Sequence, residues 1–315
     1  MKNKTLLLIG GTGFFGKSIL DYFSRNIYLN KKINKIIVLS RSSFNSKIVV
    51  EVKKNYKFKK INADILRIKK LPKANYVIYC ALLKDYKDDY LALKNYVNLA
   101  KSYHRNSQIL YISSGAIYGK QPTNLKKIKE SYIFLNKKNN YLRNEKKNQY
   151  SLLKLKSEKV FKKLKDYGIR ISIARCFAFV GRFLPRNSKY AVGNFIENIL
   201  KNKNILVKSN YNVIRTYMYA DDLVRWLIKI LENSKINCPT YNVGSENAVN
   251  LQKFCKILAT KYNLNCILGK TNKNRYDIYV PNTYKIKKEL NLVTKFNSLK
   301  AVTKTINLLK KNEKN

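Results

Sequence analysis

The sequence predicts an α/β fold: a Rossmann-type, doubly wound parallel sheet followed by a smaller C-terminal α/β domain. Short apolar runs of strand length alternate with helix-like stretches through the first half of the chain, and the first run ends in a glycine-rich turn that opens a helix. Alternating strands and helices pair in parallel through right-handed crossovers. The chain has 315 residues, which exceeds the usual span of one compact domain and predicts two domains.

The elements of the first half follow from hydrophobic periodicity. A short apolar run of strand length lies at residues 4–9, and further strand candidates lie at 35–39, 57–61, 76–80, 108–113 and 169–175. Helical patterns follow the first run to about residue 25 and recur at 88–103 and 150–165. The polar, lysine-rich stretch 120–149 is long for a connection within a domain, which is typical of a functional lid.

The second half is less regular. Helices are expected at residues 191–201, 220–233, 250–262 and 298–311. A strand near 240–243 is expected to return to the first sheet. The boundary between the domains is therefore placed after residue 178, which gives a first domain over 1–178 and a second over 179–315.

The formal net charge of +47 raises the question of a nucleic-acid or membrane partner. The lysines are spread along the whole chain and accompany abundant Asn, Ile, Tyr and Phe, which all have A/T-rich codons. A compositional bias explains this pattern without a binding function, since no block has the clustering of a dedicated basic tail. We expect no specific nucleic-acid partner, whereas anionic substrates are favoured either way.

Several classes of mechanism are disfavoured by composition. The five cysteines, at 80, 176, 238, 255 and 266, form neither a C-x-x-C pair nor a zinc cluster, so we expect reduced core residues and no metal site. One histidine, His104, leaves little for a Ser-His-Asp triad.

No apolar run approaches the roughly 18 residues that span a bilayer, and the first one stops at Gly10, too short for a signal peptide. A cytoplasmic protein without membrane partners is expected.

A glycine motif predicts a dinucleotide site. Gly10, Gly13 and Gly16 lie between the first strand and its helix, the context in which this spacing carries meaning. Their missing side chains let the backbone turn tightly and approach a pyrophosphate at the helix N-terminus. Phe14 and Phe15, inside the same turn, join the expected cofactor-binding residues. The alternative is a merely flexible glycine-rich turn.

Two further motifs suggest acid/base chemistry. Tyr150 and Lys154 lie four residues apart at the start of a predicted helix, which puts phenol and ammonium on one face. A nearby ammonium favours phenolate and lowers the pKa of a phenol toward the working range of a catalyst. Ser114 follows a strand, at the sheet edge where ligands bind in open α/β folds. The alternatives are an exposed helix face for the pair and a turn cap for the serine.

Taken together, these three motifs resemble the extended short-chain dehydrogenase/reductase family of the NAD-dependent epimerase/dehydratase type. The resemblance covers nearly the whole chain and rests on the order and spacing of the motifs. It implies that Ser114 is the catalytic serine, that Tyr150 is the acid/base and that Lys154 binds the nicotinamide ribose. A homodimer is one assembly compatible with it.

The resemblance extends to other segments of the first domain. Ala63-Asp64-Ile65 resembles the adenine-contacting segment, with Asp64 and Ile65 as cofactor-binding residues. Cys80-Ala81-Leu82 resembles the loop that lines the cofactor, which implicates Ala81. Asn95 matches the helix asparagine found near the active site. The first domain is thus expected to be the NAD(P)-binding domain.

The second domain, which the resemblance makes mainly substrate-binding, has its own matches. Asn194 resembles the residue that meets a nucleotide diphosphate, and Arg215 resembles the diphosphate-binding arginine. The alternatives are a helix cap and a solvated charge. Ala178 replaces the usual asparagine of the R-x-F-N-x-x-G segment, which puts one substrate contact in doubt.

The implied reaction is reversible hydride transfer on a nucleotide-linked sugar. Dehydratases of this family carry an Asp-Glu pair after the catalytic residue, whereas Gly115 and Ala116 follow Ser114 here, so an epimerase or a ketosugar reductase is favoured. Ser40-Arg41 ends the second strand where an acidic residue would bind NAD, so NADP is slightly favoured over NAD. The rival hypothesis is a non-catalytic NADP-binding or RNA-binding protein on the same scaffold.

Overall fold

The computed structural model describes residues 4–26, 29, 32–42, 47–132, 146–186, 190–269 and 272–313. The chain forms two compact units, each assembled from separate stretches. Unit 1 comprises Met1–Gly119, Phe134–Arg175 and Val224–Tyr241. Unit 2 comprises Lys120–Ile133, Cys176–Leu223 and Asn242–Asn315. The expected single boundary after residue 178 therefore differs from the observed division, because the chain passes between the units more than once.

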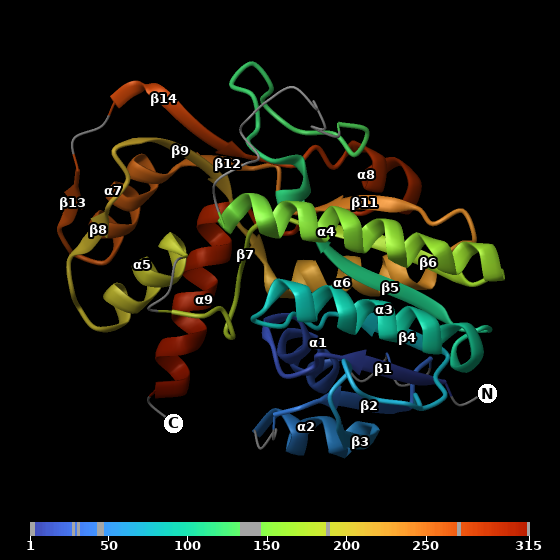
Figure 1. Ribbon diagram of the computed structural model, residues 1–315. Coiled ribbons are helices and arrows are strands. Elements are labelled where there is room, and N and C mark those ends of the chain that lie inside the picture. Colours follow the sequence, from blue (N-terminus) through green and yellow to red (C-terminus); the bar gives the residue numbers. More distant parts are fainter. Residues whose placement is uncertain are drawn as a thin grey trace. The chain divides into compact units, whose positions relative to one another are not determined.

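A seven-stranded sheet in the order β11-β6-β5-β4-β1-β2-β3 organises unit 1 (Figure 1). The strands are β1 Thr5–Ile9, β2 Lys35–Ser40, β3 Lys57–Asn62, β4 Tyr76–Tyr79, β5 Gln108–Ser114, β6 Arg170–Cys176 and β11 Thr240–Val243. The pairings from β3 to β5 are parallel. The order reverses between β1 and β4, and ligands of such folds bind beyond the carboxyl ends of the strands at this point.

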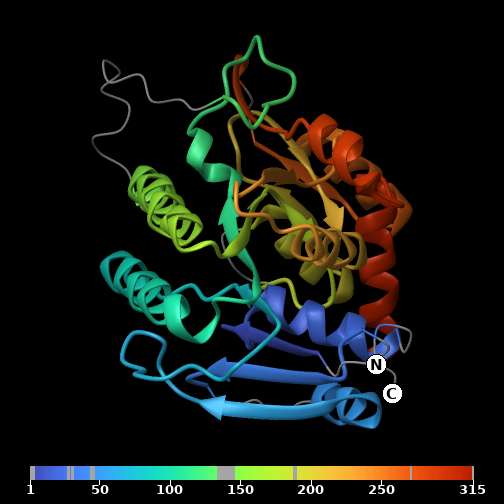
Figure 2. The ribbon, with the colours of Figure 1, turned by 90° about the vertical axis from the view of Figure 1, so that its right-hand side faces the viewer.

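Helices cover both faces of this sheet. They are α1 Phe14–Arg25, α2 Lys47–Asn55, α3 Tyr86–Tyr103, α4 Lys146–Lys162 and α6 Ala220–Glu232, with short 3-10 helices η2 Gly115–Tyr118 and η4 Lys163–Tyr167. Figures 1 and 2 show α3 and α4 side by side on one face and α1 on the other. Strands covered on both faces are continuously apolar, as in β4, where all four residues are buried.

Unit 2 combines helices with three small sheets. Its helices are α5 Ala191–Leu200, α7 Leu251–Lys261, α8 Tyr284–Leu290 and α9 Ser298–Glu313. Its strands are β7 Phe179–Val180, β8 Ile205–Val207, β9 Tyr211–Thr216, β10 Met218–Tyr219, β12 Ala248–Asn250, β13 Cys266–Leu268 and β14 Asn272–Tyr279. They pair as β12-β9-β14, β13-β8 and β10-β7. Phe195, Phe254 and Ile306 lie in the apolar core that these elements enclose.

Most expected elements are confirmed, including the strand near 240–243, which pairs at the edge of the large sheet as β11. The sequence did not predict α2, α8 or the strands β7 to β10 and β12 to β14. Five of these strands, β7, β8, β10, β12 and β13, have only two or three residues, which is too short to show an alternation. Of the expected lid over 120–149, residues 133–145 lie outside the described residues and 120–132 belong to unit 2, whereas 146–149 form the start of α4.

The expectation of five reduced core cysteines is wrong for one pair. Cys255 of α7 and Cys266 of β13 form a disulfide, because the fold brings this helix against this strand with the two Cα atoms 6.2 Å apart. A separation of 11 residues matches no recognised cysteine motif. Cys80, Cys176 and Cys238 take part in no disulfide with the described residues.

The described residues lack two features that would indicate particular functions. No helix among them has the length and apolar character needed to cross a membrane. The same residues contain no group of three or more His, Cys, Asp or Glu side chains arranged to hold a metal ion.

Candidate active site

The glycine turn joins the end of β1 to α1. Gly10 has a φ of +84°, in the region that favours glycine, and a Cβ there would collide with the backbone of Ala81. A Cβ at Gly16 would collide with the backbone of Gly11. Packing within the protein therefore explains two of the three glycines of the motif.

Gly13 differs from its neighbours. Its backbone is extended, and the nearest atom to a Cβ built there is the Gly10 carbonyl oxygen at 3.8 Å, so packing does not require a glycine. The residue is exposed and is the N-cap of α1, where a glycine offers no side chain to bond the first-turn amides. The open surface and the helix N-terminus suit a phosphate group.

The residues that the sequence links to the adenosine half of a cofactor follow the ends of β2 and β3. Arg41 Nη1 lies 3.9 Å from Asp64 Oδ2, and the arginine side chain is 57% exposed. The other carboxylate oxygen of Asp64 accepts a hydrogen bond from the Leu66 amide at 3.0 Å. The exposed guanidinium is therefore only loosely paired, and Asp64 partly offsets its charge.

Asn95 of α3 bonds to the adjacent segment rather than to the Tyr-Lys pair. Its side-chain amide donates to the carbonyl oxygens of Ile65 at 2.9 Å and Ile68 at 3.0 Å. The Asn95 side chain thus fixes the segment around Ala63-Asp64-Ile65, which resembles the adenine-contacting segment of the family.

Lys154 of α4 is buried at the centre of the candidate catalytic group. Its ammonium donates to the Tyr111 hydroxyl at 3.3 Å and lies 3.5 Å from Asp89 Oδ2. The same nitrogen lies 5.8 Å from the centroid of the Tyr150 ring, so the two residues share one helix face. Burial lowers the pKa of Lys154, but Tyr111 and Asp89 raise it more, and the net pKa lies above the ordinary value. The ammonium therefore stays charged at neutral pH.

The two serines that end β5 have different partners. Ser113 donates to Glu158 at 2.6 Å in the buried interior. Ser114 Oγ accepts from the Ala116 amide at 3.1 Å and caps η2, which is the turn-cap alternative. A hydroxyl that accepts one hydrogen bond still carries a donor hydrogen and a second lone pair. Ser114 can therefore cap the turn and bond a substrate oxygen.

A buried ion pair, which the sequence analysis did not identify, supports these serines. Glu158 of α4 and Arg175 of β6 approach to 2.8 Å, with their side chains 2% and 3% exposed. Arg175 also donates to the Tyr118 hydroxyl at 3.0 Å. Glu158 lies one helical turn after Lys154 but pairs with Arg175 of another element, so helix spacing gave no signal for this ion pair.

In unit 2, the two residues matched to diphosphate binding lie on α5 and β9. Asn194 is half-buried, and its backbone amide donates to the Tyr190 carbonyl at 3.2 Å. Arg215 donates to the Asp277 carboxylate of β14 at 2.8 Å and to the Asp277 carbonyl at 2.7 Å. The guanidinium is thus held by a neighbouring strand rather than extended into solvent.

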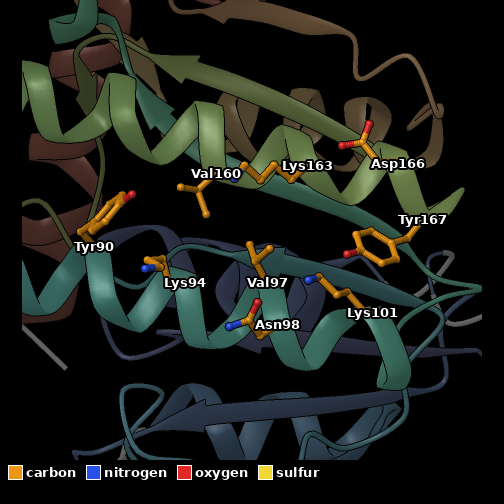
Figure 3. A pocket seen from close by; sticks show the side chains of 9 residues that line it. All are labelled: Tyr90, Lys94, Val97, Asn98, Lys101, Val160, Lys163, Asp166 and Tyr167. Atoms are coloured by element: carbon orange, nitrogen blue, oxygen red, sulfur yellow. The ribbon is translucent and has the colours of Figure 1, made fainter.

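A groove also runs along the outer side of α3 and α4 in unit 1 (Figure 3). Its volume is about 610 Å³, and its lining includes Lys94, Lys101, Lys163 and Asp166. Neither Ser114, Tyr150 nor Lys154 lines it. The groove is therefore separate from the candidate active site.

Comparison with protein families decides the classification. The model of the NAD dependent epimerase/dehydratase family matches residues 6–244, which include the glycine turn, Ser114, Tyr150 and Lys154. The chain belongs to this family. It is therefore an enzyme of the extended short-chain dehydrogenase/reductase type.

Solved structures of this epimerase/dehydratase fold align with nearly the whole chain. The UDP-glucose 4-epimerase of Thermotoga maritima, solved with UDP-glucose, has a TM-score of 0.77 at 18% identity and covers 98% of this chain and 99% of its own. The UDP-N-acetylglucosamine 4-epimerase of Methanobrevibacter ruminantium M1 has a TM-score of 0.78 at 17% identity, covering 99% and 100%. At these identities the likeness shows the fold.

One curated relative aligns over a shorter stretch. UDP-glucuronic acid decarboxylase 1 of Danio rerio is 27% identical over 95 residues, which is 30% of this chain. The match spans 22% of the length of that relative.

The open surface at Gly13 gives a prediction for cofactor binding. If the glycine turn holds a pyrophosphate, Gly13→Ala should weaken cofactor binding at least about tenfold, equivalent to about 1.4 kcal/mol, because the added methyl group would occupy the space that the pyrophosphate needs. The stability of the Gly13→Ala variant should equal that of the wild type, because the site has room for a Cβ. Fluorescence titration with NADH and NADPH, beside thermal unfolding, measures both quantities.

Gly16→Ala is the contrasting variant, since its Cβ would meet the backbone of Gly11 and should lower stability. Cofactor affinity equal to that of the wild type in Gly13→Ala would contradict a pyrophosphate at this position.

Proposed function

We propose that this enzyme catalyses reversible hydride transfer at a carbinol or keto carbon of a nucleotide-linked sugar, as an epimerase or a ketosugar reductase. The observation that carries the proposal is the buried Lys154 ammonium, which lies against Tyr150 on the same helix face. Such an ammonium favours the phenolate form of a neighbouring tyrosine. The glycine turn and Ser114 belong to the same compact unit.

The residues present fit a nicotinamide dinucleotide, since Gly13 leaves an open surface at the N-terminus of α1. The glycine turn would hold the pyrophosphate, and Lys154 would bond the nicotinamide ribose. The bound cofactor supplies or accepts the hydride. Tyr150 exchanges the proton of the sugar oxygen, and the Ser114 hydroxyl holds that oxygen by a hydrogen bond.

The absence of an acid after Ser114 argues against elimination or decarboxylation. Gly115 and Ala116 occupy these positions and form the start of η2. Neither has a side chain that can move a proton. A 4,6-dehydratase or a UDP-glucuronic acid decarboxylase activity is therefore disfavoured. This holds although a dTDP-glucose 4,6-dehydratase resembles nearly all of this chain and a UDP-glucuronic acid decarboxylase resembles part of it.

In unit 2, Asn194 and Arg215 are proposed to bind the nucleotide diphosphate of the substrate. The Asp277 carboxylate holds Arg215 in a fixed orientation and reduces its net charge. Arginine suits this role because its planar guanidinium can donate two parallel hydrogen bonds to phosphate oxygens.

Incubation with a panel of nucleotide sugars and 4-keto sugars, with and without added NADPH, tests the proposal. An epimerase gives an isomeric product without added cofactor, whereas a reductase consumes one NADPH for each product. Identification of the products by mass spectrometry and NMR separates the two. Lack of turnover on the whole panel, with cofactor bound, would overturn the proposed reaction.

The exposed Arg41 is proposed to select NADP by a charge-assisted bond to the adenosine 2′-phosphate. Arg41→Ala should lower the preference for NADPH over NADH by roughly tenfold or more, since such bonds contribute about 1.5–3 kcal/mol. Arg105→Ala is the matched control, because Arg105 is exposed in the turn between α3 and β5. Fluorescence titration of both cofactors gives the ratio, and an unchanged ratio in Arg41→Ala would refute the assignment.

A further inference from the structure

A buried carboxylate of α3 contacts two segments of the candidate cofactor site. Asp89 is 3% exposed. One of its oxygens, Oδ1, accepts a hydrogen bond from the Leu83 backbone amide at 2.9 Å. The other, Oδ2, lies 3.5 Å from the Lys154 ammonium. Leu83 directly follows the Cys80-Ala81-Leu82 segment, and Lys154 belongs to the Tyr-Lys pair.

Among the described residues, the other titratable groups that act on this ion pair are phenols. Tyr79 of β4 and Tyr111 of β5 face it from the sheet, and Tyr150 faces the ammonium from α4. Burial raises the pKa of Tyr79 and of Tyr111, so both stay neutral near pH 7. Asp89 is therefore the formal negative charge that balances Lys154 in this buried position.

We propose that Asp89 is a positioning residue: its carboxylate keeps Lys154 charged and in place, while its second oxygen anchors the segment before Leu83. A single side chain would thereby couple two parts of the cofactor site. The proposal rests on the proposed function for the role of Lys154 at the nicotinamide ribose. The pairing itself is independent of which substrate the enzyme uses.

Burial decides in which direction the pKa of Lys154 shifts when its counter-ion is removed. A buried ammonium without a counter-ion has a lowered pKa, by up to several units. In wild type Tyr111, Asp89 and Tyr150 together offset this loss, so Lys154 keeps its proton into strongly basic conditions. Without Asp89 the phenols alone remain, and Lys154 should lose its proton at a lower pH. Cofactor binding that depends on the charged Lys154 ammonium should then weaken as the pH rises.

Asp89→Asn tests the negative charge of Asp89 separately from its hydrogen bond to the Leu83 amide. Asparagine keeps an Oδ1 acceptor for the Leu83 amide but removes the negative charge beside Lys154. Asp88→Asn is the matched control, with the same change one residue away, because Asp88 lies on α3 without contacting Lys154. Asp89→Ala removes both the charge and the acceptor.

Cofactor affinity is measured by NADH and NADPH fluorescence between about pH 6.5 and 9.5. In Asp89→Asn it should fall by about tenfold from neutral to basic pH, since its lysine loses the proton within this window. Wild type and Asp88→Asn should change much less. Asp89→Ala should also bind more weakly at neutral pH, because the anchor at Leu83 is lost. An Asp89→Asn profile parallel to that of wild type would overturn the proposal.

A double-mutant cycle on urea unfolding tests the pairing without cofactor or substrate. Asp89→Asn and Lys154→Met each leave a buried unpaired charge, whereas the double variant leaves none. The double variant should therefore be more stable than the sum of the two single losses predicts. Additive losses would show that the two side chains are not coupled and would overturn the pairing. If coupling is found but no nucleotide sugar is turned over, the proposed function fails and the role of Asp89 stands.

Discussion

Replacing Tyr150 with phenylalanine is expected to lower kcat by about 10²–10⁴, the usual contribution of positioned acid/base catalysis. The change removes only the hydroxyl and keeps the ring that lies 6.0 Å from the Tyr86 ring and beside the Lys154 ammonium. Cofactor affinity should change little, because the glycine turn and Lys154 remain. The expected pattern is therefore a loss in kcat without a loss of binding.

Steady-state or stopped-flow turnover, measured beside a cofactor titration, tests this expectation. Tyr90→Phe is the matched control, since Tyr90 lies on α3 and lines the outer groove (Figure 3). Near-normal turnover in Tyr150→Phe would remove this residue from the mechanism and leave the Tyr-x-x-x-Lys spacing as a coincidence of the helix face.

Replacing Glu158 with glutamine is expected to destabilise the protein by about 3–5 kcal/mol, the usual result when one partner of a buried ion pair is removed. Arg175 would then keep its charge in the interior beside a neutral amide. Glu158 also accepts the hydrogen bond from Ser113, next to the proposed catalytic serine. Turnover should therefore fall together with stability.

The control for this variant is an ion pair of equal length on the surface. Lys54 and Glu51 also approach to 2.8 Å, but their side chains are 60% and 51% exposed. Glu51→Gln should change the free energy of unfolding by less than about 1 kcal/mol, because solvent screens an exposed pair. Urea unfolding of both variants measures the difference. Equal losses in the two variants would show that burial does not decide the contribution of the Glu158 pair.

The parts of the fold that are encoded locally could be predicted from the sequence. The four residues before Gly10 are apolar and buried because β1 is covered on both faces, and Gly16 is needed because of a steric contact with Gly11 only five residues away. The four-residue spacing of Tyr150 and Lys154 is enough to place both side chains on one helix face. Their functional roles stay predictions, since these depend on groups that the chain binds.

The parts that depend on contacts across the chain could not be predicted. Asp89 and Glu158 look like solvated acids in lysine-rich helices, and burial becomes visible only when Lys154 and Arg175 are placed against them. Asn95 fits a family position by spacing, yet its amide bonds to the carbonyls of Ile65 and Ile68. The Cys255–Cys266 disulfide depends on the packing of α7 against β13, which no cysteine spacing encodes.

The interleaved path of the chain has a consequence for dissection of the enzyme. The boundaries after residues 119, 133, 175, 223 and 241 mean that no single cut separates the two units. A fragment ending at residue 178 would lack β11 and the segment that bonds Ile171 and Ile173, through the carbonyls of Lys235 and Pro239. It would therefore expose the β6 edge of the sheet, and an unprotected apolar edge promotes aggregation. Domain exchange between homologous enzymes must accordingly transfer several segments at once.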